Sequence, residues 1–207
     1  MQIYFKYTLS SKIFKRGFTL MELIIVTTIA TILMTTLVVQ QGKWNDSLAL
    51  NTQTYELALM IRQAQIYSLG VRENTSGTGD KFSGGYGVYF GSDYSQYIFY
   101  GDKNGNQKYD NGEAIETKSF TRGVLVDRFC GVKGTGQEED RCSPGQGNVA
   151  FLHISFFRPD PKANLFLLKG GGNTAVNVIP PVTVYLRSNE GQFKSIKVES
   201  NGQISIQ

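Results

Sequence analysis

Residues 18–39 read FTLMELIIVTTIATILMTTLVV, and this stretch decides the architecture that the sequence predicts. It contains a single charge, at Glu22, and neither proline nor glycine. A helix rises about 1.5 Å per residue, so these residues are long enough to cross the ~30 Å hydrocarbon core of a bilayer. The sequence therefore predicts a transmembrane helix over residues 18–41.

The residues ahead of this helix are basic. Residues 1–17 contain no acid, and their basic side chains are Lys6, Lys12, Lys15 and Arg16. This asymmetry predicts that the N-terminus stays in the cytoplasm and that the rest of the chain is exported. Without these four residues, 21 − 4 = 17 basic side chains balance 17 acidic ones. A near-neutral mature chain gives no reason to expect a nucleic-acid partner.

The small residue Gly17 lies before the apolar stretch, not after it. A secretory signal peptide has a shorter apolar core followed by a small-residue cleavage site. Cleavage after Gly17 would instead leave the apolar helix on the mature chain. A lone carboxylate within a membrane span costs a few kcal/mol unless it is paired. Glu22 is therefore either an interfacial charge tolerated near the helix start, or the partner of a neighbouring subunit's α-amino group, which cleavage would create at Phe18.

Residues 16–23, RGFTLMEL, resemble the type IV prepilin processing motif. In that family a prepilin peptidase cuts after the glycine and methylates the new N-terminus, and the glutamate then pairs with a terminus during assembly. The resemblance implies cleavage between Gly17 and Phe18, methylation of Phe18 and an assembly contact at Glu22. It also implies other pilin subunits as partners, and residence in the cytoplasmic (inner) membrane followed by an extracytoplasmic filament. The alternative is an ordinary membrane anchor.

The helical pattern continues beyond the predicted span. Apolar residues recur at intervals of three, four and seven, at Trp44, Leu48, Tyr55, Leu59, Ile66 and Leu69. This spacing predicts an amphipathic second half over residues 42–70 whose apolar stripe packs on a sheet, with Gly70 as the C-terminal stop. A single-pass anchor followed by a separate short helix has the same periodicity.

Residues 71–207 are expected to form an extracytoplasmic β-rich domain after a polar linker at 74–85. Short β-like runs alternate with glycine, asparagine or proline, which is typical of antiparallel strands joined by tight turns. The runs span residues 86–90, 96–100, 114–120, 124–129, 149–157, 165–168, 182–187, 193–199 and 203–207. Hairpin loops are expected at 188–192 and 200–202. The predicted fold is α+β, with a long N-terminal helix packed on an antiparallel sheet.

The closing residues VTVYLRSNEGQFKSIKVESNGQISIQ, with the strand-rich region before them, resemble the GspH/FimT-like minor pilins and pseudopilins. This resemblance implies a minor pilin-like subunit. Some of these relatives bind DNA through arginines near the C-terminus. The tail after Lys197 has no basic residue, so that function is not carried over.

Cys130 and Cys142 enclose a loop rich in glycine and charge. In an exported protein such a pair is expected to form a disulfide, which contributes about 3 kcal/mol in the chain-entropy model. Two free thiols are the alternative. Zinc does not fit, because it requires four ligands and the chain has two cysteines and one histidine.

The loop at residues 102–113, DKNGNQKYDNGE, has the oxygen spacing of a calcium-binding loop. Oxygen side chains stand at the first, third, fifth, ninth and twelfth positions, which are Asp102, Asn104, Asn106, Asp110 and Glu113. An EF-hand loop uses this spacing and adds the carbonyl of the seventh residue, here Lys108. The glycine of the sixth position is replaced by Gln107, and flanking helices are absent from the pattern. A structural Ca²⁺ and a plain hairpin loop therefore both remain open.

The sequence does not favour an enzyme. His153 lies in the apolar run FLHISFF, which is typical of a sheet, and the acidic run at residues 138–140 reads as a solvated loop between the cysteines. Three functions remain: a type IV pilus subunit, a GspH-like pseudopilin of a type II secretion system, and a membrane-tethered Ca²⁺-dependent binding module. The first two share one leader motif, so the sequence does not separate them.

Overall fold

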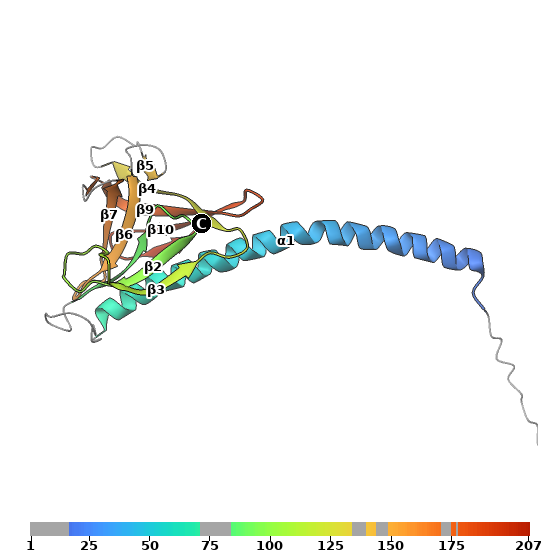
Figure 1. Ribbon diagram of the computed structural model, residues 1–207, viewed down its shortest axis with the longest axis horizontal. Coiled ribbons are helices and arrows are strands. Elements are labelled where there is room, and N and C mark those ends of the chain that lie inside the picture. Colours follow the sequence, from blue (N-terminus) through green and yellow to red (C-terminus); the bar gives the residue numbers. More distant parts are fainter. Residues whose placement is uncertain (1–16, 71–83, 134–139, 144–148, 171–174, 177) are drawn as a thin grey trace, which may run out of the picture. The chain divides into compact units, whose positions relative to one another are not determined.

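The computed structural model describes residues 17–70, 84–133, 140–143, 149–170, 175–176 and 178–207. Residues 1–16 of the expected leader and most of the expected linker at 74–85 lie outside the described residues. The chain divides into two compact units, Met1–Gly42 and Lys43–Gln207. The predicted α+β fold is confirmed, since a long helix and antiparallel sheets make up the described chain (Figure 1).

Helix α1 runs without interruption from Leu20 to Leu69, as the sequence predicted. Its start is fixed by Thr19, whose hydroxyl accepts a hydrogen bond from the backbone N–H of Glu22 at 3.2 Å. Its end is fixed at Gly70, whose N–H donates to the Ile66 carbonyl at 2.9 Å. A separate short helix after the apolar stretch is therefore excluded.

The strands form two antiparallel sheets, where the sequence had predicted one. The six-stranded sheet has the order β3-β2-β1-β6-β7-β8 and the five-stranded sheet the order β11-β10-β9-β4-β5 (Figure 1). The strand bounds are β1 Tyr86–Phe90, β2 Gln96–Gly101, β3 Ala114–Ser119, β4 Leu125–Lys133, β5 Asp140–Ser143, β6 Val149–Phe156, β7 Ala163–Lys169, β8 Ala175–Val176, β9 Val178–Arg187, β10 Phe193–Val198 and β11 Ile204–Ile206.

Most expected strands and both expected hairpins are confirmed. The loop between β9 and β10 closes with a hydrogen bond from the Ser188 N–H to the Gln192 carbonyl, and the loop between β10 and β11 with one from Glu199 to Gln203. Strands β5 and β8 were not predicted. Strand β5 reads DRCS, and because it has no apolar alternation nothing in the sequence indicated it. Asp140 therefore lies in a strand and not in the expected solvated loop. Residues 138 and 139 lie outside the described residues.

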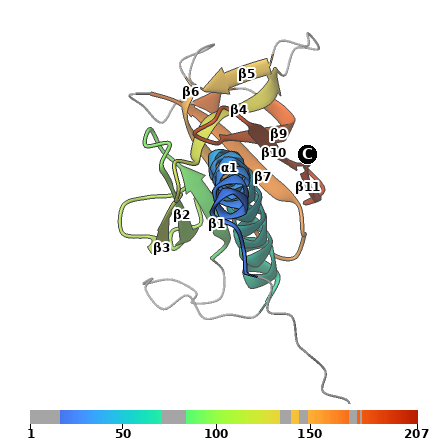
Figure 2. The same cartoon turned by 90° about the vertical axis from the view of Figure 1, so that its right-hand side faces the viewer.

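The prediction for the packing face of α1 was wrong. The expected stripe from Trp44 to Leu69 is exposed, with exposed fractions of 41–78 %. The face that packs on the sheets carries Ala49, Leu50, Leu57, Met60, Ile61 and Ala64. These side chains join the inward-facing residues of both sheets in one hydrophobic core, and Figure 2 shows α1 end-on beside the strands. The helix is apolar on two opposite faces, so its spacing alone did not identify the buried face.

Two polar contacts fix the helix on the sheets. The Gln65 amide donates to the carbonyls of Pro161 and Gly202, each at 3.1 Å. Gly202 has a φ of +85°, and a Cβ added there would collide with the Pro161 carbonyl. Closer to the helix end, the buried Ser68 hydroxyl accepts the N–H of Tyr86 at the start of β1, at 2.8 Å. These contacts set the rotation of α1 and hence the face that it exposes.

Candidate functional site

The predicted cleavage site lies immediately before α1. Gly17 and Phe18 precede the helix, and Phe18 is exposed. Glu22 lies in the first turn, three residues after the capping Thr19, which is the spacing of a capping box. A carboxylate here is stabilised by the partial positive charge of the helix start. The helix would therefore begin two residues after a new N-terminus at Phe18.

The threonines of the apolar stretch satisfy their own hydroxyls. Each donates to a backbone carbonyl three or four residues earlier, which removes the need for water inside a bilayer. The donors are Thr27 and Thr28 to Ile24, Thr31 to Thr27, Thr35 to Thr31, and Thr36 to Leu33. These residues were not predicted to have a role, although the recurring i, i+4 spacing of Thr27, Thr31 and Thr35 was a visible signal.

The apolar side chains between Phe18 and Val38 are exposed, including Leu23, Ile29 and Leu37. In the described part of the chain, α1 is the one helix long and apolar enough to cross a membrane. Exposed apolar surface of this extent marks a site of contact with lipid or another protein.

The loop at 102–113 is tightly organised by its own side chains. The buried Asp102 carboxylate accepts the N–H groups of Asn104, Gly105 and Gln107 at 2.6–3.2 Å. The buried Glu113 carboxylate accepts the N–H groups of Lys103 and Asp110, both at 2.9 Å. These bonds explain the acidic residues at both ends of the loop, because Asp102 holds its first half and Glu113 joins its last residues to Lys103 near its start.

The middle of the same loop brings the other predicted ligands together. The side-chain amides of Asn104 and Asn106 both donate to the Asp110 carboxylate, at 2.8 and 2.6 Å. Within the described residues, no group of three or more His, Cys, Asp or Glu side chains is arranged to hold a metal ion. The predicted ligand set also uses amide and backbone oxygens, including the Lys108 carbonyl, so calcium at this loop stays a prediction.

The loop also covers the outer face of the six-stranded sheet. The Tyr109 N–H donates to His153 Nδ1 at 2.9 Å, and the Ser155 hydroxyl donates to the Gln107 carbonyl at 3.0 Å. The ring of Tyr109 lies 4.7 Å from that of Tyr89. Burial, assisted by the nearby Lys108 ammonium, lowers the pKa of His153 to about 4, so the imidazole is neutral at pH 7. His153 is thus the sheet residue that the sequence predicted.

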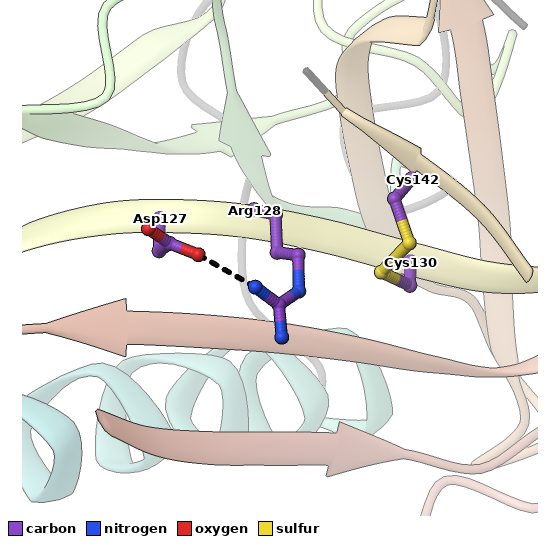
Figure 3. Close-up of a disulfide and its surroundings, with 4 residues drawn as sticks. All are labelled: Asp127, Arg128, Cys130 and Cys142. Carbon is purple, nitrogen blue, oxygen red and sulfur yellow. Dashed lines mark hydrogen bonds and ion pairs between the residues drawn. A yellow bond between two sulfur atoms is a disulfide. The ribbon is translucent and has the colours of Figure 1, made fainter. Parts of the chain in front are cut away.

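The predicted disulfide is confirmed: Cys130 in β4 and Cys142 in β5 lie directly opposite each other and are joined (Figure 3). On the same strand, the bulged Asp127 pairs with the guanidinium of Arg128 at 2.9 Å. Arg128 also lies over the ring of Tyr185, 4.4 Å from its centroid. The disulfide therefore ties the edge strand β5 to a strand that is already held in the sheet.

Comparison with known protein families matches residues 14–38 to the prokaryotic N-terminal methylation motif. The chain carries the N-terminal signature of pilin-like proteins. The match includes the expected cleavage site and Glu22, and extends along the apolar half of α1. No curated protein and no solved structure matches the chain. The resemblance of the β-rich part to GspH/FimT-like subunits therefore stays a prediction.

The pilin-like signature and the geometry agree at the N-terminus. The motif ends at residue 38, within the stretch of α1 whose described apolar side chains are exposed. Together they indicate a chain anchored by one membrane helix.

Proposed function

We propose that this chain is a structural subunit, of the minor-pilin kind, of a type IV pilus filament. A prepilin peptidase cleaves it between Gly17 and Phe18 and methylates Phe18. Before assembly, residues 18–39 hold it in the cytoplasmic membrane, and after assembly the chain lies in an extracytoplasmic filament. Its role is mechanical, and it has no catalytic step.

One observation carries this proposal: the methylation motif at residues 14–38 includes the start of a helix whose apolar residues lie exposed. Cleavage after Gly17 keeps that helix on the mature chain. Fully burying each large apolar side chain is worth about 1.5–3 kcal/mol, so the helix gains stability from lipid first and from neighbouring subunits later. A leader peptidase that removed the helix would discard this surface.

Glu22 supplies the polar part of the assembly contact. Glu22 lies in the first helical turn, four residues after the residue that would carry the new α-amino group. Away from water a lone carboxylate is costly, and a neighbouring subunit's charged terminus offsets that cost. A Glu22→Ala variant is expected to be cleaved normally but left out of filaments, whereas Glu56→Ala, on an exposed part of the same helix, is incorporated.

The deciding experiment is the N-terminal mass of the protein from membranes and from sheared surface filaments. A chain that begins at N-methylated Phe18 supports the proposal. An intact leader in both fractions contradicts it and reduces the helix to an anchor.

A pseudopilin of a type II secretion system is the second candidate, because the methylation motif is shared by both kinds of filament. Neighbouring genes discriminate between them: a secretion channel indicates a pseudopilin, whereas retraction and extension motors of a pilus indicate a pilin.

A further inference from the structure

Strand β3 forms one edge of the six-stranded sheet and is open to solvent along its length (Figure 2). It pairs with β2 on one side, and no strand of the described chain pairs with its other side. Five of its six residues are exposed, and Lys118 is half-buried. An edge of this kind is a template for a further strand, because its outward N–H and C=O groups have no neighbouring strand to bond.

The other sheet edges in the described part of the chain are shorter than β3. Strands β5, β8 and β11 have four, two and three residues, whereas β3 has six. The disulfide already joins β5 to its neighbour, and the residues of β11 are half-buried. Strand β3 is therefore the edge best suited to accept a strand from another chain.

The pairing of β3 with β2 determines which backbone groups point outwards. The Phe120 N–H, just after β3, donates to the Ser95 carbonyl at 2.8 Å. In an antiparallel pair, residues that bond the partner alternate with residues that do not. Counting back from Phe120, the backbone groups of Thr117 and Ser119 therefore point to the open side. A register shift after Phe99 in β2 limits this regular pattern to the C-terminal part of β3.

Two opposite charges lie on either side of Thr117 along the strand. The Glu116 carboxylate and the Lys118 ammonium are 3.5 Å apart and both are partly exposed. Charged side chains on an edge strand discourage pairing with an apolar strand. The order of the two signs is self-complementary, however, because an antiparallel copy presents its base to the acid and its acid to the base.

These charges favour one register between two copies of β3. When Thr117 lies opposite Thr117 of the second copy, each Glu116 lies opposite the other copy's Lys118. The nearest registers that keep the hydrogen bonds are slides of two residues, and they set Glu116 opposite Glu116 or Lys118 opposite Lys118. Like charges directly opposite each other destabilise a strand pair, whereas opposite charges stabilise it.

We propose that β3 pairs antiparallel with β3 of a second copy of this chain, with the two Thr117 residues opposite each other on a two-fold axis. The two Thr117 residues exchange a pair of backbone hydrogen bonds, and four charges alternate in sign around the axis. A two-fold contact closes on itself, whereas a filament grows by head-to-tail contacts. The pairing therefore goes beyond the proposed function: it does not extend a filament, and it does not depend on the filament role.

Disulfide trapping of the full-length chain in detergent tests the register. Cys130 and Cys142 are joined and are the only cysteines of the chain, so Thr117→Cys provides the only free thiol. Mild oxidation is expected to give a covalent dimer, because Cα atoms opposite each other in a hydrogen-bonded pair are about 5.5 Å apart, within disulfide reach. Ser119→Cys is the matched control on the same exposed edge. Its two copies would lie about 13 Å apart along the strands, so no dimer is expected.

Charge reversal separates specific pairing from random collision of exposed thiols. In the Thr117→Cys background, Glu116→Lys gives a strand with two positive charges and Lys118→Glu a strand with two negative charges. Each variant alone is expected to trap poorly, since like charges then lie opposite each other. A mixture of the two, each with its own tag, is expected to give a doubly tagged dimer in roughly fivefold excess over either dimer of one kind.

Each other outcome would overturn the proposal. Trapping of Ser119→Cys in place of Thr117→Cys would refute the register. Equal trapping at both positions, or a doubly tagged dimer no more abundant than random pairing gives, would refute specific pairing. Absence of any dimer would refute the contact and leave Glu116 and Lys118 as charges that only guard the edge. Cleavage at Phe18 is measured separately by the N-terminal mass, so failure of one proposal does not imply failure of the other.

Discussion

Replacing Leu57 with alanine tests which face of α1 holds the domain together. Leu57 is 0 % exposed and lies in the core between helix and sheets, whereas Leu59, two residues later, is 66 % exposed. A buried Leu→Ala change costs about 2–5 kcal/mol, because it loses the transfer free energy of the side chain and leaves a cavity. With about 2–4 °C per kcal/mol for a unit of this size, a loss of about 3 kcal/mol lowers the melting temperature by roughly 6–12 °C.

The assay is thermal unfolding of the fragment Lys43–Gln207, which forms one compact unit. Leu59→Ala is the matched control, since it removes the same atoms from an exposed position and alanine favours helix slightly more than leucine. Its expected effect on the free energy of unfolding is within about 0.5 kcal/mol. If Leu59→Ala were the strongly destabilising change and Leu57→Ala the neutral one, the exposed face of α1 that carries Leu59 would be the packing face and the assignment of the two faces would be reversed.

Three further outcomes are expected of the same fragment. Gly202→Ala should lower the free energy of unfolding by about 2 kcal/mol or more, and Gly191→Ala should lower it by less. Both glycines have positive φ, but only Gly202 lacks room for a Cβ. Equal losses of the two variants in urea unfolding would argue against the close contact at Gly202. Because the pKa of His153 falls from its ordinary 6.5 to about 4 in the fold, the unfolded chain binds a proton that the folded chain does not, and stability should fall by up to about 3 kcal/mol as the pH drops from 6.5 towards 4. A His153→Gln variant should show a shallower decline in melting temperature, and an unchanged decline would exclude His153 as its source. Calcium is expected to raise the melting temperature of the parent, and Asp110→Asn should reduce that rise; a parent that does not respond to calcium would remove the proposed site.

The sequence was a good guide wherever one residue type has one physical meaning. Gly70 ended the helix as expected, and the hairpin at 188–192 formed where asparagine and glycine permit a tight turn. The cysteine pair joined because its partners are the only cysteines in the chain. The methylation motif was visible because its basic, small, aromatic and acidic residues stand at fixed distances.

The sequence was a poor guide where one residue pattern is compatible with more than one structure. Strand β5 has no apolar alternation, and it is defined by its pairing with β4 and by the disulfide. The loop at 102–113 has the spacing of a calcium loop, yet hydrogen bonds to its own backbone already use Asp102 and Glu113. Spacing alone did not show that this loop would also cover His153 and the outer face of a sheet.

The choice between the two faces of α1 follows from side-chain size. Ala49, Ala64 and Ser68 lie on the buried face, where small residues let the helix backbone approach the sheets closely. The opposite, exposed face instead carries Trp44 and Tyr55 among its large side chains, which would hold a sheet further away. Periodicity treats alanine and tryptophan as equally apolar, and for that reason it predicted that the face with Trp44 and Tyr55 packs on the sheets, whereas the face with Ala49 and Ala64 does.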